Sequence, residues 1–130
     1  MRTAALWLFA CVTLPGLFCC SSNDKNDPVT VAQECYDMLL AGNYDAFLAG
    51  RAHMDSIPES FREQLLVNYK QFVFDQKKSH GGISAFKAMS AQTDSANHQS
   101  LVFMQVIFAD STTEEIVVPM VECNGKWKMR

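Results

Sequence analysis

The sequence predicts a single α+β domain in which helices are followed by an antiparallel sheet. Apolar residues recur at helical spacing over residues 28–79, and the period changes to the alternation of strands after Gly81-Gly82. Near the end of the chain, Asn124-Gly125 is a strong signal for a tight hairpin. Helices that precede strands, instead of alternating with them, are typical of α+β domains.

Three helices are expected, over about 28–41, 43–51 and 58–79. The first has a good start, because Asp27 can cap the helix and Pro28 suits the first helical position. Gly42 should end it, Asn43 can cap the second helix, and the double glycine ends the third.

Apolar stripes on the first and third helices predict which faces meet the core. In the first helix, Gln33 and Asp37 lie opposite the stripe and should face solvent. Its stripe consists of Val29, Ala32, Cys35, Tyr36, Leu39 and Leu40. The core-facing stripe of the third helix consists of Phe61, Leu65, Tyr69, Phe72 and Val73.

Four strands are expected, over about 83–93, 99–109, 114–123 and 126–130, forming a curved antiparallel meander. The second strand is apolar at nearly every position, so both of its faces are apolar. One face would pack on the helices. The other face would need a ligand, a second copy of the chain or another partner.

Two stretches resemble a known superfamily. Residues 28–45 contain a proline, an Ala-x-x-x-Tyr helix and then Gly-Asn-Tyr-Asp, and residues 124–129 read Asn-Gly-Lys-Trp-Lys-Met. These features resemble the nuclear transport factor 2-like (cystatin-like roll) superfamily, and within it small bacterial lipoproteins that carry domains of unknown function. The resemblance covers nearly all of 28–130 and implies a sheet curled around helices into a cone. We expect the cone to be lined by Tyr36, Leu40, Tyr69, Phe72, Met104 and Trp127.

Residues 1–19 are typical of a signal peptide. Arg2 supplies a positive charge, and the apolar run Ala4–Leu14 is too short to span a bilayer. The next residues, Leu17-Phe18-Cys19-Cys20, resemble a bacterial lipobox, which implies cleavage before Cys20 and lipid attachment to it. An ordinary signal peptide that leaves an unmodified thiol is the alternative.

Residues 20–27 are then expected to form a lipidated cysteine followed by a short polar tether. Acidic residues soon after such a cysteine resemble an export signal of surface lipoproteins in Gram-negative gut bacteria, and Asp24 and Asp27 fit that pattern. The expected location is the cell envelope, with a lipid anchor in the outer membrane and the domain facing the periplasm or the surface.

After processing, Cys35 and Cys123 would remain in the domain. They could form a disulfide in an exported protein, or each could be a small buried apolar residue. The spacing of cysteines and histidines matches no zinc site, so we expect neither a metal nor a cofactor.

The composition and the candidate residues favour binding over catalysis. The formal net charge is −3 and the basic residues are scattered, which argues against nucleic acid as a partner. Some enzymes of the nuclear transport factor 2-like superfamily set a carboxylate or histidine base against a tyrosine inside the cone. In this sequence Tyr36 and Tyr69 are candidates for the tyrosine, but no base is found where the superfamily would place one. We therefore expect a non-catalytic domain that binds a small hydrophobic ligand, an envelope protein or a second copy. The alternatives are an isomerase or dehydratase acting on a small hydrophobic substrate, and a structural accessory without a ligand.

Overall fold

In the computed structural model, which describes residues 26–130, helix α1 spans Pro28–Leu40. The Asp27 side chain accepts a hydrogen bond of 3.2 Å from the backbone N–H of Thr30, so the predicted cap is formed. The chain reverses at Gly42, where φ is +81°. Glycine adopts this left-handed conformation without strain because it has no Cβ. The predicted signal peptide, Cys20 and most of the tether lie outside the described residues.

The remaining helices follow as the sequence predicts. Helix α2 spans Tyr44–Ala49, a 3₁₀ turn η1 spans Met54–Ser56 and helix α3 spans Glu59–His80. Among residues 26–130, none of the helices combines the length and the hydropathy that spanning a bilayer requires.

The sheet is an antiparallel meander of four strands in the order β1-β2-β3-β4. Its strands are β1 Ile83–Asp94, β2 Gln99–Phe108, β3 Thr113–Cys123 and β4 Lys126–Met129. The β3–β4 hairpin turns at Asn124 and Gly125, both with positive φ, as the Asn-Gly pair predicts. Helices followed by a curved four-stranded meander confirm the predicted fold class.

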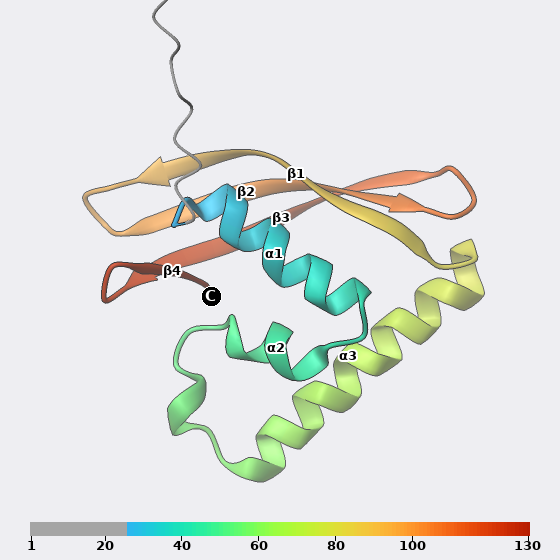
Figure 1. Cartoon of the computed structure of the whole chain (residues 1–130), viewed down its shortest axis with the longest axis horizontal. Helices are drawn as coiled ribbons and strands as arrows, with labels where there is room; N and C mark the ends of the chain where they lie inside the picture. The colour runs from blue at the N-terminus through green and yellow to red at the C-terminus, as the bar shows by residue number, and fades with distance from the viewer. Residues whose placement is uncertain (1–25) are drawn as a thin grey trace, which may run out of the picture.

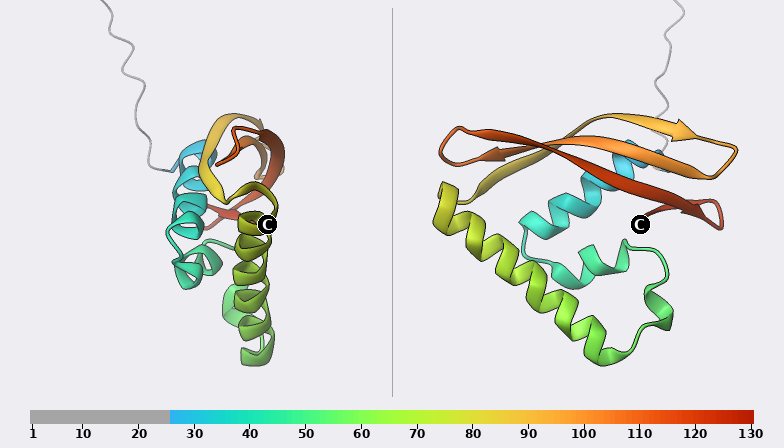
Figure 2. Two further views of the ribbon diagram at one scale, coloured as in Figure 1. Left: turned by 90° about the vertical axis from the view of Figure 1, so that its right-hand side faces the viewer. Right: turned by 180° about the vertical axis from the view of Figure 1, so that it is seen from behind.

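The helices all lie on one side of the twisted sheet (Figure 1). Helix α1 packs directly against it and crosses the strands. Helix α3 meets the sheet at its C-terminal end and diverges from it toward its N-terminal end, as the view from behind shows (Figure 2). In this view α1 and α2 lie between the sheet and α3, whereas the view turned by 90° shows them beside α3 (Figure 2).

The core lies between α1 and the inner face of the sheet. Alternate residues of β2 are buried there, whereas their neighbours on the outer face are exposed or half-buried. The buried positions of β2 are Ser100, Val102, Met104, Val106 and Phe108. On the outer face Leu101, Phe103 and Val117 remain exposed, and Phe103 pairs directly with Val117 across β2 and β3.

Gln33 does not face solvent as the stripe of α1 predicts. Its side-chain amide donates to the backbone carbonyl of Phe86 at 2.7 Å and accepts from the backbone N–H of Ala88 at 2.7 Å. β1 is an edge strand of the sheet, so the backbone groups on its outer side are free to pair with a side chain. Gln33 thereby joins α1 to β1.

The predicted core stripe of α3 is wrong in most of its members. None of the residues of α3 is buried, and Phe61 and Phe72 are 50% and 43% exposed. Only Tyr69 and Val73 pack against the core, both half-buried. The stripe marks one face of the helix, but the divergence of α3 from the sheet leaves much of that face uncovered.

Candidate functional site

The space between α3 and the sheet is an apolar cleft of about 450 Å³. Its size falls in the range of small-molecule sites. Side chains from α1, α2, α3 and the first three strands contribute to its walls. Six aromatic side chains line it: Tyr36, Phe47, Tyr69, Phe72, Phe86 and Phe108.

Four of these aromatic rings contact one another in a chain. Tyr36 lies edge-on to Phe47 with ring centroids 5.1 Å apart, and it contacts Phe86 at 4.9 Å. Phe47 in turn lies edge-on to Tyr69 at 4.9 Å. Edge-to-face contacts of this kind hold rings in fixed relative orientations, so this wall of the cleft is preformed.

The cleft has a polar end where Arg51 lies. Its Nη1 donates a hydrogen bond of 2.9 Å to the hydroxyl of Tyr69. Burial raises the pKa of the Tyr36 hydroxyl, and the neighbouring Tyr69 and Cys35 raise it further, whereas the Arg51 guanidinium lowers it. Tyr36 therefore remains a protonated hydrogen-bond donor at neutral pH.

At the other end, His80 joins α3 to the turn between β2 and β3. Its Nδ1 lies 2.9 Å from a carboxylate oxygen of Asp110, and its ring stacks on Phe108 with centroids 4.1 Å apart. Hydrogen bonds from the side chain and backbone of Thr112, and then from His80, lower the pKa of Asp110 from 3.8 to about 2. These contacts fix the C-terminal end of α3 where it meets the sheet.

The structure brings together three of the residues that we expected to line a pocket and separates three others. Tyr36, Tyr69 and Phe72 all line the cleft. Met104 and Trp127 do not, because they point into the core, where they are 1% and 9% exposed. Leu40 lies at the end of α1 and lines a different, smaller hollow, while its neighbour Leu39 takes the place in the cleft.

Sequence reasoning missed three polar residues at this site. Glu114 and Gln76 line the cleft, and Arg51 lies at its polar end. Glu114 could have been found, because strand alternation puts it on the same face as Ile116 and the buried Val118. The position of Arg51 has no signal in the sequence, since it depends on how the segment after α2 contacts the end of the chain.

Cys35 and Cys123 are free thiols, so the disulfide is absent from the described part of the chain. Cys35 is buried, and burial raises the pKa of its thiol. Its Sγ lies so close to Gly50 that a Cβ added there would be 2.6 Å away. Cys35 thus behaves as a small apolar residue, and Cys123 is half-exposed at the end of β3.

The described residues give the cleft few groups for acid–base chemistry. No histidine among residues 26–130 lines it, and its one carboxylate, Glu114, is exposed. Over the same range no three His, Cys, Asp or Glu side chains cluster as a metal site would require.

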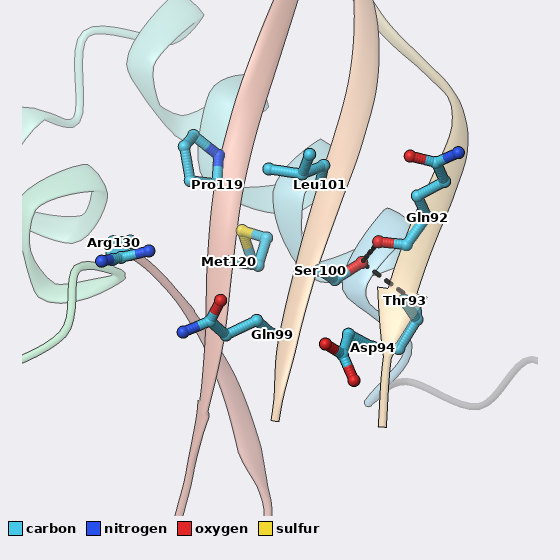
Figure 3. A pocket seen from close by; sticks show the side chains of 9 residues that line it. All are labelled: Gln92, Thr93, Asp94, Gln99, Ser100, Leu101, Pro119, Met120 and Arg130. Carbon is cyan, nitrogen blue, oxygen red and sulfur yellow. Dashed lines mark hydrogen bonds between the residues drawn. The ribbon is translucent and has the colours of Figure 1, made fainter. Parts of the chain in front are cut away.

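A second hollow of about 420 Å³ lies at the opposite end of the sheet (Figure 3). Its walls are mainly polar strand residues. Ser100 is buried there, and its hydroxyl is already bonded to the Gln92 carbonyl at 3.2 Å and to the Thr93 hydroxyl at 3.0 Å. We therefore take the aromatic cleft as the candidate site.

Comparison with known proteins supports the fold. No protein-family model matches the chain, and no curated protein does. A solved structure from Campylobacter jejuni, described as a nuclear transport factor 2-like transpeptidase, superposes with a TM-score of 0.62. The match covers 79% of this chain and 96% of the other, at 13% sequence identity. The chain has the nuclear transport factor 2-like fold. In this fold a curled sheet and helices enclose a cone, and here the cone is the aromatic cleft beneath α3.

Proposed function

We propose that this protein is an envelope lipoprotein whose domain binds a small apolar ligand in the cleft between α3 and the sheet, without catalysing a reaction. The observation that carries the proposal is the cleft itself, with six aromatic side chains around about 450 Å³. Such a site is concave and mostly apolar, with a few polar groups, as ligand sites usually are.

The exposed apolar surface of α3 supports this proposal. Phe72 lines the cleft and is still 43% exposed, and much of the helix face toward the cleft has nothing packed on it. Burial of apolar surface stabilises a complex by about 25 cal/mol per Å² removed from water. A ligand in the cleft would supply the apolar contacts that α3 does not make with the sheet.

The binding site is tested by two substitutions on the same helix. Phe72→Asp places a charge in the cleft, and Phe74→Asp places the same charge on a residue that does not line it and is 55% exposed. The exported protein with Cys20→Ser would be titrated with the neutral probe N-phenyl-1-naphthylamine, whose fluorescence rises in apolar sites. We expect Phe72→Asp to weaken binding at least about tenfold, since one charge near an apolar ligand costs more than 1.4 kcal/mol.

The matched variant decides the interpretation. Phe74→Asp should bind the probe like the parent protein. Equal losses in both variants, or no loss in Phe72→Asp, would show that the probe binds elsewhere and would remove the support for this site. Native mass spectrometry of the same protein would reveal a ligand retained from the cell as a reproducible extra mass.

The lipid anchor is proposed from the sequence alone, since Cys20 lies outside the described residues. The wild-type protein should partition into the membrane fraction, and Cys20→Ser should release it into the soluble envelope fraction. Release is expected because acyl chains provide about 0.8 kcal/mol of membrane affinity per buried CH₂. A Cys20→Ser protein that stays with the membrane would contradict the anchor.

A catalytic alternative rests on one observation, the carboxylate of Glu114 in the same cleft as two tyrosines. An isomerase or dehydratase would use such a carboxylate as a base and a tyrosine hydroxyl as a donor to the developing oxyanion. Turnover of a small hydrophobic carbonyl compound that is abolished by Glu114→Gln would favour this alternative. Binding of the compound without turnover would favour the non-catalytic function.

A further inference from the structure

A small hollow of about 180 Å³, to which two arginines contribute, continues the aromatic cleft at the uncovered edge of β3. Tyr36, Phe47 and Tyr69 line both spaces, and so does Val117 at the uncovered edge of β3, so one molecule could occupy the two together. The hollow is open at this edge because β4 pairs with β3 only over Met120–Cys123.

Two arginines reach this hollow because the backbone on either side of Met129 is held in place. The N–H of Met129 donates to the Gly50 carbonyl at 2.8 Å, and the Ala52 N–H donates to the Met129 carbonyl at 2.7 Å. Arg51 lies between these two bonds, and Arg130 follows Met129. A further bond of 2.9 Å from the Arg130 N–H to the Pro119 carbonyl fixes Arg130 beside β3. Figure 3 shows Arg130 on the side of β3 away from β2.

The hollow is rich in hydrogen-bond donors, because two guanidinium groups and two tyrosines lie at it. Arg51 and Arg130 line it together with the rings of Tyr36 and Tyr69. None of its lining side chains is acidic, and neither arginine forms an ion pair with another described side chain. Arg51 uses one N–H for the Tyr69 hydroxyl, and a guanidinium has five, so donors remain for an anion.

We propose that this hollow binds the anionic head group of an amphipathic ligand whose apolar tail lies in the aromatic cleft. The inference rests on the proposed function, because it names the class of molecule bound at the same site. The planar guanidinium of Arg51 can donate two parallel hydrogen bonds to a carboxylate, and such charge-assisted pairs are among the stronger hydrogen bonds in proteins. Burial raises the pKa of Tyr36, so its hydroxyl stays protonated and can donate a further hydrogen bond to the anion.

The test compares two probes with the same tail. Octanoate and 1-octanol would be titrated by calorimetry into the exported Cys20→Ser protein. We expect octanoate to bind about tenfold tighter or more, as a charge-assisted hydrogen bond is worth that factor. Arg51→Gln should remove most of this preference, because octanoate loses more affinity than 1-octanol does. Continued binding of 1-octanol also shows that the variant is folded.

Two further variants keep the test sharp. Arg62→Gln makes the same change of charge on α3, outside the cleft and the hollow. Arg62 pairs with Asp45 at 3.3 Å, and its substitution should leave the preference for octanoate over 1-octanol unchanged. Arg130→Gln should reduce the preference like Arg51→Gln but leaves the Arg51–Tyr69 bond intact. A loss of preference in Arg62→Gln equal to that in Arg51→Gln would overturn the proposed head-group site.

The outcomes separate the two proposals. Binding of both probes with equal affinity would overturn the head-group site and leave the apolar cleft standing. Binding of neither probe would overturn both. Octyl phosphate in a third titration distinguishes the source of the anionic oxygens, because a phosphate ester that binds tighter than octanoate would indicate a phospholipid-like head instead of a carboxylate.

Discussion

Helices α1 and α3 have similar sequence patterns but very different environments. The 13 residues of α1 bury four side chains, among them Ala32, Cys35 and Leu39, and Gln33 joins this helix to β1. The 22 residues of α3 bury none. An apolar stripe therefore predicts that a helix has a face to cover, but what covers that face is decided by the rest of the molecule. In α1 the sheet covers it, and in α3 part of it is left for a ligand.

The largest expected difference between the two helices is in the cost of losing an apolar side chain. Leu39→Ala in α1 should lower the free energy of unfolding by about 3 kcal/mol, because Leu39 is 3% exposed and its loss leaves a void. Phe74→Ala in α3 should cost less than about 0.5 kcal/mol, since the side chain is 55% exposed. Urea denaturation of both variants measures the difference, and similar midpoints would mean that α3 is not the loosely packed helix.

Tight packing of α1 is also visible at Gly50, which faces Cys35. The φ of Gly50 is −75°, so alanine would suit the backbone, but its Cβ would lie 2.6 Å from the Cys35 Sγ. We expect Gly50→Ala to destabilise the protein by about 2 kcal/mol through overpacking. Thermal or urea unfolding would measure this effect.

A second substitution identifies the cause. If the contact with Cys35 is responsible, Gly50→Ala combined with Cys35→Ala should be more stable than the sum of the two single effects predicts. Additive effects would point instead to the two other near neighbours, the Phe47 carbonyl at 3.3 Å and Met129 Cε at 3.4 Å.

A smaller effect is expected from the polar contact between α1 and the sheet. Gln33→Ala leaves the carbonyl of Phe86 and the N–H of Ala88 without their side-chain partner, which should cost about 1 to 2 kcal/mol. The matched change Gln71→Ala on α3 removes an exposed bond to Asp75 and should have almost no effect. If Gln33→Ala and Gln71→Ala lowered the free energy of unfolding by the same amount, the bonds of Gln33 to β1 would contribute nothing measurable to stability.

The comparison of α1 and α3 also explains what could be predicted from the sequence. Local signals such as Asp27-Pro28, Gly81-Gly82 and Asn124-Gly125 depend on neighbouring residues alone. They predicted where the adjoining helices and strands begin and end to within a few residues. The position of Tyr69 in the cleft followed from helical spacing. By contrast, the location of Met104 in the core depends on which face of a strand, apolar on both sides, the helices cover.

The polar end of the site could not be predicted either, because it depends on contacts between segments that are distant in sequence. Arg51 lies beside the cleft because the segment after α2 pairs with Met129, far along the chain. Gln33 bonds to β1 because this strand lies at the edge of the sheet, where its outer backbone groups are available. Such contacts join residues that are distant in sequence, and no periodicity records them.

The smallest expected effect concerns the attachment of α3 to the sheet through His80 and Asp110. The pKa of Asp110 is about 2 in the folded protein, below its ordinary value of 3.8, chiefly because of hydrogen bonds from Thr112. A lowered pKa means that the folded state binds this proton less readily than the unfolded state. The contribution of Asp110 to stability is therefore present above the unfolded pKa of 3.8 and is lost as the pH falls through the interval from 3.8 to about 2.

This prediction can be checked at a single carboxyl group by NMR. The side-chain carbon of Asp110 should titrate with a midpoint near 2, and Thr112→Val should move that midpoint toward 3.8. The effect on global stability should be slight, because the carboxylate is exposed and solvent screens its interactions. A midpoint near 3.8 in the parent protein would mean that Thr112 and His80 do not hold Asp110 in solution. The contact between His80 of α3 and Asp110 of the turn after β2 would then be lost, and α3 would be even less constrained relative to α1 than its exposure already indicates.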